Sequence, residues 1–337
     1  MDARQVDTDV LIAGGGPAGA AAAITCARNG VRVILCERDA IAGERPGETL
    51  HPGIEPLLAQ LGVADRLAAV TGARHSGIWI EWGSARRFEA FGADERGAWQ
   101  GYQVWRADFD AMLLDRAREL GADVRRPCAA TGVLDDGRVE TTDGVVAARV
   151  KVDATGRARW LGRALRVAAE PRSPRLFARY GYVEGECPPR DDAPALVADA
   201  EGWTWTACVR PRLYQWTRVG FDGEQTAADW LPDEFTGMAR CGPARGADVT
   251  WRIAERVADA DWFMVGDAAA ILDPTSSHGV LKALMSGMMA GHLITVIVQE
   301  RAPAHEAAAA YHAWLTGWFA TDAARLGEFY RQLNVEV

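Results

Sequence analysis

Paired cysteines are absent from this sequence of 337 residues: none of its six cysteines forms a C-x-x-C motif. Their spacing excludes the common zinc and thioredoxin-type sites, and scattered thiols are typical of a reducing compartment. We therefore expect a cytoplasmic protein without a metal site.

An excess of positive charge is also lacking. The chain has 37 Lys and Arg against 46 Asp and Glu, a formal net charge of −9 and a pI of about 5.3. Such an acidic surface excludes nucleic acid and anionic membranes as main partners. We find no apolar signal-peptide segment at the N-terminus. The longest apolar run, residues 283–298, contains two glycines, a serine and a histidine. We expect a buried helix there and no membrane span.

A glycine-rich turn near the N-terminus is the first strong positive signal. Residues 10–13 form a short apolar run, and Gly14–Gly19 then reads GGGPAG before an alanine-rich segment and a second apolar run at 31–36. This order makes a βαβ unit with a G-x-G-x-x-G motif. Gly14 allows the tight turn, Gly16 lets the backbone approach a pyrophosphate, and Gly19 permits close packing of helix on strand. Glu37 follows the second strand, where a carboxylate accepts ribose hydroxyls, so we expect a bound dinucleotide.

The rest of the chain contains two kinds of sequence pattern. Residues 106–120 have helical periodicity, and short strands with Asp-Gly turns fill 130–153. Aromatic strands at 177–183, 203–209 and 213–220 predict an antiparallel sheet, after which a buried strand at 262–265 precedes helices at 278–299 and 304–333. We predict an α/β fold with an inserted antiparallel sheet. The expected dinucleotide-binding domain comprises residues 1–75, 104–165 and 255–300. The substrate domain comprises 76–103 and 166–254, and a C-terminal helix lies in 301–337.

Two further segments distinguish FAD from NAD. Val152–Gly156 reads VDATG after a strand, and Phe263–Asp267 reads FMVGD before a helix. With the glycine turn, these segments make the chain resemble the FAD-dependent monooxygenase and halogenase superfamily, whose FAD domain is glutathione-reductase-like. The resemblance implies that Asp267 and Pro274 contact FAD, that Arg106 contacts it from the start of a helix, and that the helix dipole behind Asp267 stabilises the reduced ring. The cofactor-binding residues expected are Gly14, Gly16, Pro17, Ala18, Gly19, Glu37, Arg38, Arg45, Glu48, Arg106, Thr155, Gly156, Asp267, Pro274 and Gly279.

A finer resemblance rests on three segments: Gly47–Pro52, Leu213–Arg218 and Asp273–Leu284. They look like the flavoproteins that mature cysteine-tryptophylquinone oxidases by oxygenating a tryptophan of a partner protein, and like tryptophan-halogenase-like proteins. In a halogenase, a catalytic lysine follows the strand after the G-E-x-x-x-P loop. The chain has only Lys151 and Lys282, and Trp203–Cys208 departs from the W-x-W-x-I-P signature. The resemblance therefore favours oxygenation and disfavours halogenation. We expect Lys282 to pair with an acidic neighbour or to reach solvent.

Aromatic and histidine side chains could complete the site. Trp203 and Trp205 share one strand face, and Tyr214 and Trp216 share a face of the next strand. Each ring is either part of an ordinary core or of an aromatic wall over the flavin. The resemblance places His51 and His278 in loops that flank the ring, and we assign them as the candidate catalytic residues.

The favoured function is FAD-dependent hydroxylation of an aromatic, tryptophan-like substrate, free or bound to a protein or carrier, through a flavin C4a-(hydro)peroxide. Because no second G-x-G-x-x-G follows another strand, electrons come from transiently bound NAD(P)H or from a separate flavin reductase. Two alternatives stay open. One is a reductase of the geranylgeranyl-reductase type, and the other is a flavin-loaded protein that binds a partner without turnover.

Overall fold

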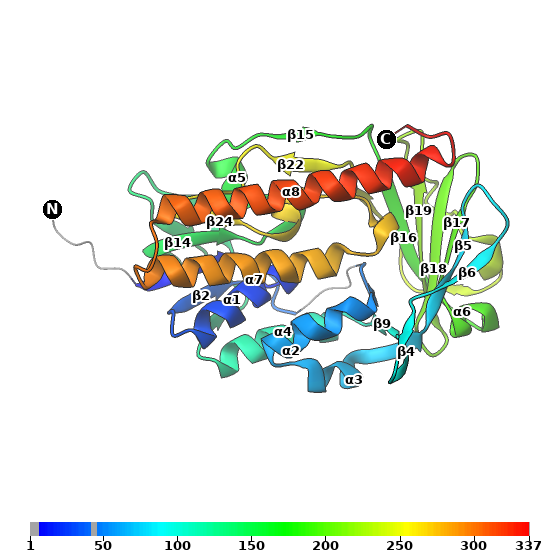
Figure 1. Ribbon diagram of the computed structural model, residues 1–337, viewed down its shortest axis with the longest axis horizontal. Coiled ribbons are helices and arrows are strands. Elements are labelled where there is room, and N and C mark those ends of the chain that lie inside the picture. Colours follow the sequence, from blue (N-terminus) through cyan, green and yellow to red (C-terminus); the bar gives the residue numbers. More distant parts are fainter. Residues whose placement is uncertain (1–6, 42–45, 337) are drawn as a thin grey trace.

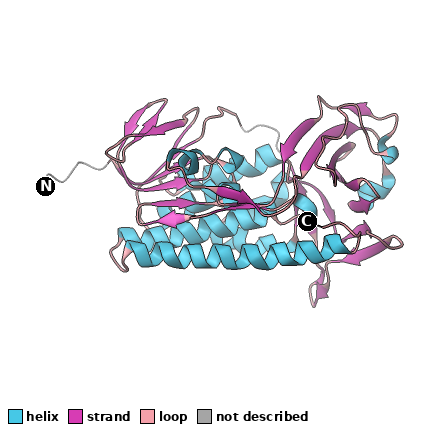
Figure 2. Cartoon of the chain, turned by 90° about the horizontal axis from the view of Figure 1, so that it is seen from above, coloured by secondary structure: helices cyan, strands magenta, loops and turns pink. Residues whose placement is uncertain are grey.

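The computed structural model describes residues 7–41 and 46–336. The molecule is elongated: helices and a parallel sheet fill one end, and a second group of long strands fills the other (Figure 1). Figure 2 shows the two groups of strands apart, with one long helix passing along both. That helix is α8 (Ala304–Arg331).

The first sheet has six strands in the order β10-β2-β1-β14-β24-β23. All neighbours run parallel except β23 and β24. The central strands are apolar and almost wholly buried, as expected for a parallel sheet covered on both faces. The strands are β1 (Thr8–Ala13), β2 (Val33–Cys36), β10 (Asp123–Arg125), β14 (Ala148–Asp153), β23 (Ala258–Asp259) and β24 (Trp262–Met264).

Helix α7 (Gly279–Val298) lies against α1 (Pro17–Arg28) at a separation that only small residues allow. A Cβ on Gly287 would come within 2.1 Å of the Ala18 carbonyl oxygen. By length and composition α7 could cross a membrane, but 44% of its most apolar window is buried inside the protein. The helix therefore contributes to the core between α1 and α8. On its other side α1 contacts α4 (Arg106–Glu119).

The second sheet has eight strands, in the order β20-β16-β19-β18-β17-β5-β6 with β21 also paired to β16. The three long strands are antiparallel, and their register places Tyr180, Thr217 and Trp205 side by side on one face. The strands are β5 (Gly77–Glu81), β6 (Arg87–Ala90), β16 (Phe177–Glu184), β17 (Ala195–Ala198), β18 (Gly202–Arg210), β19 (Leu213–Gly220), β20 (Ala239–Arg240) and β21 (Arg245–Asp248).

The two sheets confirm the expected α/β fold with an inserted antiparallel sheet. The region of short strands expected at 130–153 includes β12 (Val139–Thr141) and two strands after it that belong to different sheets. β13 (Gly144–Val146) pairs with β12 in a hairpin, whereas β14 pairs with β1, so the chain passes from one sheet to another at Ala147. The remaining elements are α2 (Glu55–Leu61), α3 (Leu67–Val70), α5 (Trp160–Ala164), α6 (Pro188–Asp192), β3 (Thr49–Leu50), β4 (Thr71–His75), β7 (Ala93–Asp94), β8 (Gly97–Ala98), β9 (Gly101–Val104), β11 (Ala130–Val133), β12 (Val139–Thr141), β15 (Ala169–Pro171), β22 (Arg252–Ala254) and β25 (Ala270–Ile271).

Candidate functional site

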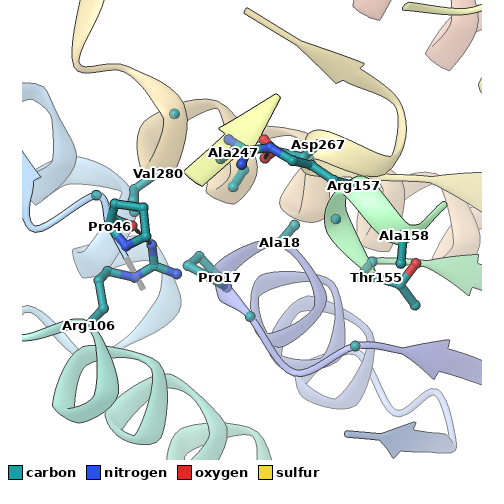
Figure 3. A pocket seen from close by; sticks show the side chains of 18 of the residues that line it. Pro17, Ala18, Pro46, Arg106, Thr155, Arg157, Ala158, Ala247, Asp267 and Val280 are labelled. Carbon is teal, nitrogen blue, oxygen red and sulfur yellow. Dashed lines mark hydrogen bonds and ion pairs between the residues drawn. The ribbon is translucent and has the colours of Figure 1, made fainter. Parts of the chain in front are cut away.

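A cavity of about 1120 Å³ lies between the parallel sheet and the antiparallel sheet. Ordinary small-molecule sites measure about 300–1,000 Å³, so this one has room for a large ligand. In Figure 3 Arg106 and Pro46 lie at one end and Thr155 and Ala158 at the other, with Pro17 between them. The carboxyl ends of β1, β2 and β14 open onto the cavity, which is where ligands bind in such sheets.

The three motif glycines have different structural roles. Gly14 has φ +105°, and a Cβ there would lie 2.3 Å from the Ala154 carbonyl oxygen. A Cβ on Gly19 would lie 2.0 Å from the Gly14 carbonyl oxygen, so Gly19 closes the turn behind the cavity and does not line it. Gly16 caps α1 and lines the cavity, and a Cβ there would meet no atom within 4 Å. The helix N-terminus is therefore bare toward the cavity, as pyrophosphate binding requires.

Two carboxylates fix the neighbouring turns. Glu37 accepts hydrogen bonds from the Gly15 nitrogen at 2.7 Å and the Asp39 nitrogen at 3.0 Å, which orients it on the cavity wall. Asp153 is fully buried at the end of β14 and accepts from the nitrogen and hydroxyl of Thr155 at 3.0 and 2.6 Å. Asp153 was not among the residues expected at the site, although it is the acidic residue of the VDATG segment. Thr155, Gly156 and Arg38, which we assigned to the cofactor, also line the cavity.

A buried ion pair holds the loop before β3. Arg106 contacts Asp110 through two hydrogen bonds of 3.0 Å, and its Nη1 donates to the Pro46 carbonyl at 2.8 Å. Arg106 lines the cavity, but its strongest contacts are within the protein, so it positions the loop that carries Glu48. Arg45, assigned to FAD above, falls outside the described residues.

Glu48 lines the same cavity and is almost completely buried. The Tyr182 hydroxyl, from β16, donates to its Oε1. Burial raises the pKa of Glu48 to about 7, although the Tyr182 hydrogen bond and the charge of Arg106 act in the opposite direction. The site thus contains a carboxyl group that changes its charge near neutral pH.

Asp267 follows β24 and faces the cavity beside Arg157, whose Nε lies 3.7 Å from Asp267 Oδ2 (Figure 3). Pro274 and Gly279 also line the cavity, at the N-terminal side of α7. Asp267, Pro274 and Gly279 therefore all line the cavity, and their contacts with FAD stay a prediction.

Of the two ring pairs considered for an aromatic wall, one lines the cavity and the other does not. Trp203 and Trp205 line the cavity. Tyr214 and Trp216 point to the opposite side of the sheet, where they pack with Phe235. The register explains the difference, because Thr217, not Trp216, is the partner of Trp205. The sheet residues that line the cavity are Ala178, Tyr180, Trp203, Trp205, Gln215, Thr217, Ala247 and Val249.

A tyrosine from α8 connects the antiparallel sheet to the loop that contains Asp273. The Tyr330 hydroxyl accepts from Trp203 Nε1 at 2.8 Å and lies 3.1 Å from the Thr275 hydroxyl. Thr275 and Trp251 Nε1 both donate to Asp273, a fully buried carboxylate that lines the cavity. No sequence motif pointed to Tyr330, which lies 127 residues from Trp203.

The candidate catalytic histidines are brought together, but neither is among the cavity-lining residues. The rings of His51 and His278 are 5.5 Å apart in an edge-on arrangement. His51 Nδ1 accepts from the Gly53 nitrogen at 3.0 Å, which gives this histidine a local capping role. Burial lowers the pKa of both imidazoles, and the charges of His51 and Lys282 lower that of His278 further. Their catalytic role stays a prediction.

The fold, the bare glycine turn and the carboxylates around it define a flavoprotein that binds FAD. Residues 7–164 match the FAD-binding domain family, and residues 94–316 match the family described as tryptophan halogenase. The second match covers more than half of the chain. The protein therefore belongs to the tryptophan halogenase family, within the FAD-dependent monooxygenase and halogenase superfamily.

Individual relatives are distant. A 1H-pyrrole-2-carbonyl-[peptidyl-carrier protein] brominase of Pseudoalteromonas luteoviolacea is 28% identical over 85% of this chain and 77% of its own length. Digeranylgeranylglycerophospholipid reductase 2 of Methanopyrus kandleri is 28% identical over 88% of this chain and 78% of its own. The solved structure of a myxobacterial chondrochloren halogenase matches 98% of this chain and 83% of the halogenase chain, with a TM-score of 0.87. At 24% identity, this match shows the shared fold alone.

Asp267→Ala is expected to weaken FAD binding by about 10- to 100-fold, because a hydrogen bond to a charged group contributes about 1.5–3 kcal/mol. Titration of the apoprotein with FAD, followed by flavin fluorescence, measures the effect. Asp115→Ala removes an equal charge from the exposed side of α4 and should bind FAD normally. Unchanged affinity in Asp267→Ala would show that its carboxylate does not contact the cofactor.

Proposed function

We propose that this protein transfers oxygen from O₂ to an aromatic group held between bound FAD and the antiparallel sheet. The observation that carries the proposal is the division of one cavity into two walls. One wall is built from the glycine turn and the loops around Asp267, and the other from Trp203, Trp205 and Tyr180. Rings on a sheet face offer stacking and edge contacts to an aromatic substrate.

The two lysines support oxygenation over halogenation. Lys282 Nζ lies 2.7 Å from Asp322 Oδ2 and 4.5 Å from the centre of the Trp318 ring, which confirms the expected pairing with an acidic neighbour. Lys151 Nζ lies 2.6 Å from Asp261 Oδ2. Both lysines belong to the described part of the chain, and neither lines the cavity. A mechanism that needs a lysine beside the substrate therefore has no residue to perform it.

The substrate that fits this wall is an uncharged aromatic group. Among the described residues, none of the eight cavity-lining residues contributed by the second sheet and its continuation is charged. A free amino acid would place its ammonium and carboxylate groups there without partners of opposite charge, at a cost of several kcal/mol. A tryptophan-like ring within a protein, or a ring attached to a carrier, avoids that cost.

FAD supplies the activation of O₂ when it is bound and reduced. The chain supplies the geometry. Arg106 and Asp110 fix the loop that closes one end of the cavity, and Tyr330 holds Trp203 against the loop of Asp273. The apolar rings keep water from the reacting groups. Electrons come from NAD(P)H that binds transiently or from a separate flavin reductase.

Halogenation is the second candidate, because the chain belongs to the tryptophan halogenase family and a relative is a brominase. Product mass separates the two candidates. The FAD-loaded protein is incubated with a flavin reductase, NADH, ¹⁸O₂ and bromide, and with tryptophan, N-acetyltryptophanamide and Trp-containing peptides. We expect ¹⁸O in the product of the uncharged substrates and no bromine. A brominated product would overturn the proposal.

A further inference from the structure

Glu48 is a buried carboxyl group for which FAD binding alone gives no explanation. It lines the cavity at 4% exposure, and its hydrogen-bonding partner Tyr182 belongs to the other sheet. Tyr182 is also buried and stands on the same face of β16 as the cavity-lining residues Ala178 and Tyr180, since alternate residues of a strand share a face. The pair therefore connects the loop on the FAD side of the cavity to the substrate wall.

Among the described residues, the cation beside Glu48 is shared with a second carboxylate. The positive group that faces Glu48 from α4 is Arg106. Its guanidinium already donates two hydrogen bonds to Asp110. From β16 the facing group is Tyr182, which donates to the carboxylate. From the loop after β24, the negative charge of Asp267 also acts on Arg106. A second negative charge placed near Glu48 would thus favour the protonated form of its carboxyl group.

We propose that Glu48 takes up a proton when the FAD bound in this cavity is reduced, and that Tyr182 sets the pH range in which this happens. Reduction places negative charge on the flavin ring, and two like charges in one buried site favour protonation of one of them. The inference rests on FAD binding and holds whichever atom the enzyme transfers.

The proton and electron balance is simple. Two electrons pass to the ring from a reduced nicotinamide or from dithionite, and the ring takes up its own proton. One further proton from solvent forms an O–H bond on the Glu48 carboxylate. Burial raises the pKa of Glu48 to about 7 before reduction, so the additional uptake occurs above about pH 7, where the carboxylate is still ionised in the oxidised protein. Below that pH the group is protonated in both states and takes up nothing.

The midpoint potential of the bound FAD measures this coupling. For a two-electron couple each coupled proton contributes about 30 mV per pH unit. Above about pH 7 the slope for the unmodified protein should exceed that for Glu48→Gln by about 30 mV per pH unit. The glutamine keeps the size of the side chain and an acceptor for Tyr182. Glu55→Gln is the matched control, because Glu55 also accepts from a tyrosine, Tyr102, but is exposed and outside the cavity. It should behave as the unmodified protein.

Tyr182→Phe gives an independent test. The Tyr182 hydroxyl stabilises the Glu48 carboxylate, so the loss of this hydroxyl should raise the pKa of Glu48. The pH range in which the midpoint potential changes more steeply should then move to higher pH. The infrared spectrum of the reduced minus the oxidised protein should gain the C=O band of a protonated acid, shifted in D₂O and missing in Glu48→Gln. Equal slopes in the unmodified protein and Glu48→Gln would overturn the proposal. Glu48→Gln could also fail to retain FAD. In that case the proposal would be overturned if the pH range of the steeper slope were the same in Tyr182→Phe as in the unmodified protein.

Discussion

Gly16→Val is expected to leave the protein folded and to abolish the retention of FAD. In the structure a Cβ at this position meets nothing within 4 Å and enters the cavity at the N-terminus of α1. A valine there would occupy the position of the pyrophosphate. We expect the affinity for FAD to fall at least about 100-fold, or about 2.7 kcal/mol, measured by FAD titration of the apoprotein. Thermal unfolding of the apoprotein should change little.

Gly19→Val is the contrasting variant on the same turn. Its Cβ would lie 2.0 Å from the Gly14 carbonyl oxygen and 3.0 Å from the Ala154 Cβ, inside packed backbone. It should lose stability in the apoprotein itself, by the 1–3 kcal/mol or so of an overpacked core. If Gly16→Val instead bound FAD normally, the pyrophosphate would lie elsewhere and the assignment of the turn would fail.

Arg106→Ala should cause the largest loss of stability among the site variants. The substitution leaves Asp110 buried and unpaired, which costs about 3–5 kcal/mol, against a total stability of about 5–15 kcal/mol for a typical domain. It also removes the hydrogen bond to Pro46 that holds the Glu48 loop. Urea denaturation of the apoprotein should show the first effect, and FAD titration the second.

Two control variants serve to interpret the stability of Arg106→Ala. Arg118→Ala breaks an exposed pair with Asp115 on the same helix and should cost at most about 1 kcal/mol. Arg106→Met combined with Asp110→Leu removes both buried charges, and it should recover much of the stability without recovering the loop contact to Pro46. A loss below about 1 kcal/mol in Arg106→Ala would mean that the ion pair contributes little.

The sequence predicted the parallel sheet well because its signals are local. A glycine turn between two apolar runs specifies the βαβ unit, and Gly14, Gly16 and Glu37, assigned to the cofactor from their spacing, line the cavity. The antiparallel sheet was harder. Alternation showed that Trp203 and Trp205 share a face, but which face of the neighbouring strand joins them depends on register, and no local signal fixes that. For that reason Tyr214 and Trp216 were also candidates for the wall.

Contacts between distant segments explain what sequence analysis missed. Glu48 was assigned to the cofactor, but its partner Tyr182 lies 134 residues further along the chain. His51 and His278 were expected beside the ring, yet they pack on each other outside the residues that line the cavity. A motif gives the neighbourhood of a side chain, whereas its direction depends on what packs around it.

The end of α8 has a consequence for attempts to alter the specificity of this protein. Tyr330 bonds to Trp203, and the adjacent Phe329 stacks on Trp82 with ring centres 4.1 Å apart. Substrate range can therefore be tuned by residues that never touch the substrate. In a library selected for acceptance of larger aromatic rings, we expect changes at Phe329 and Tyr330 to recur beside those at Trp203 and Trp205. Their complete absence from the selected variants would show that the helix merely stacks against the wall and does not determine its shape.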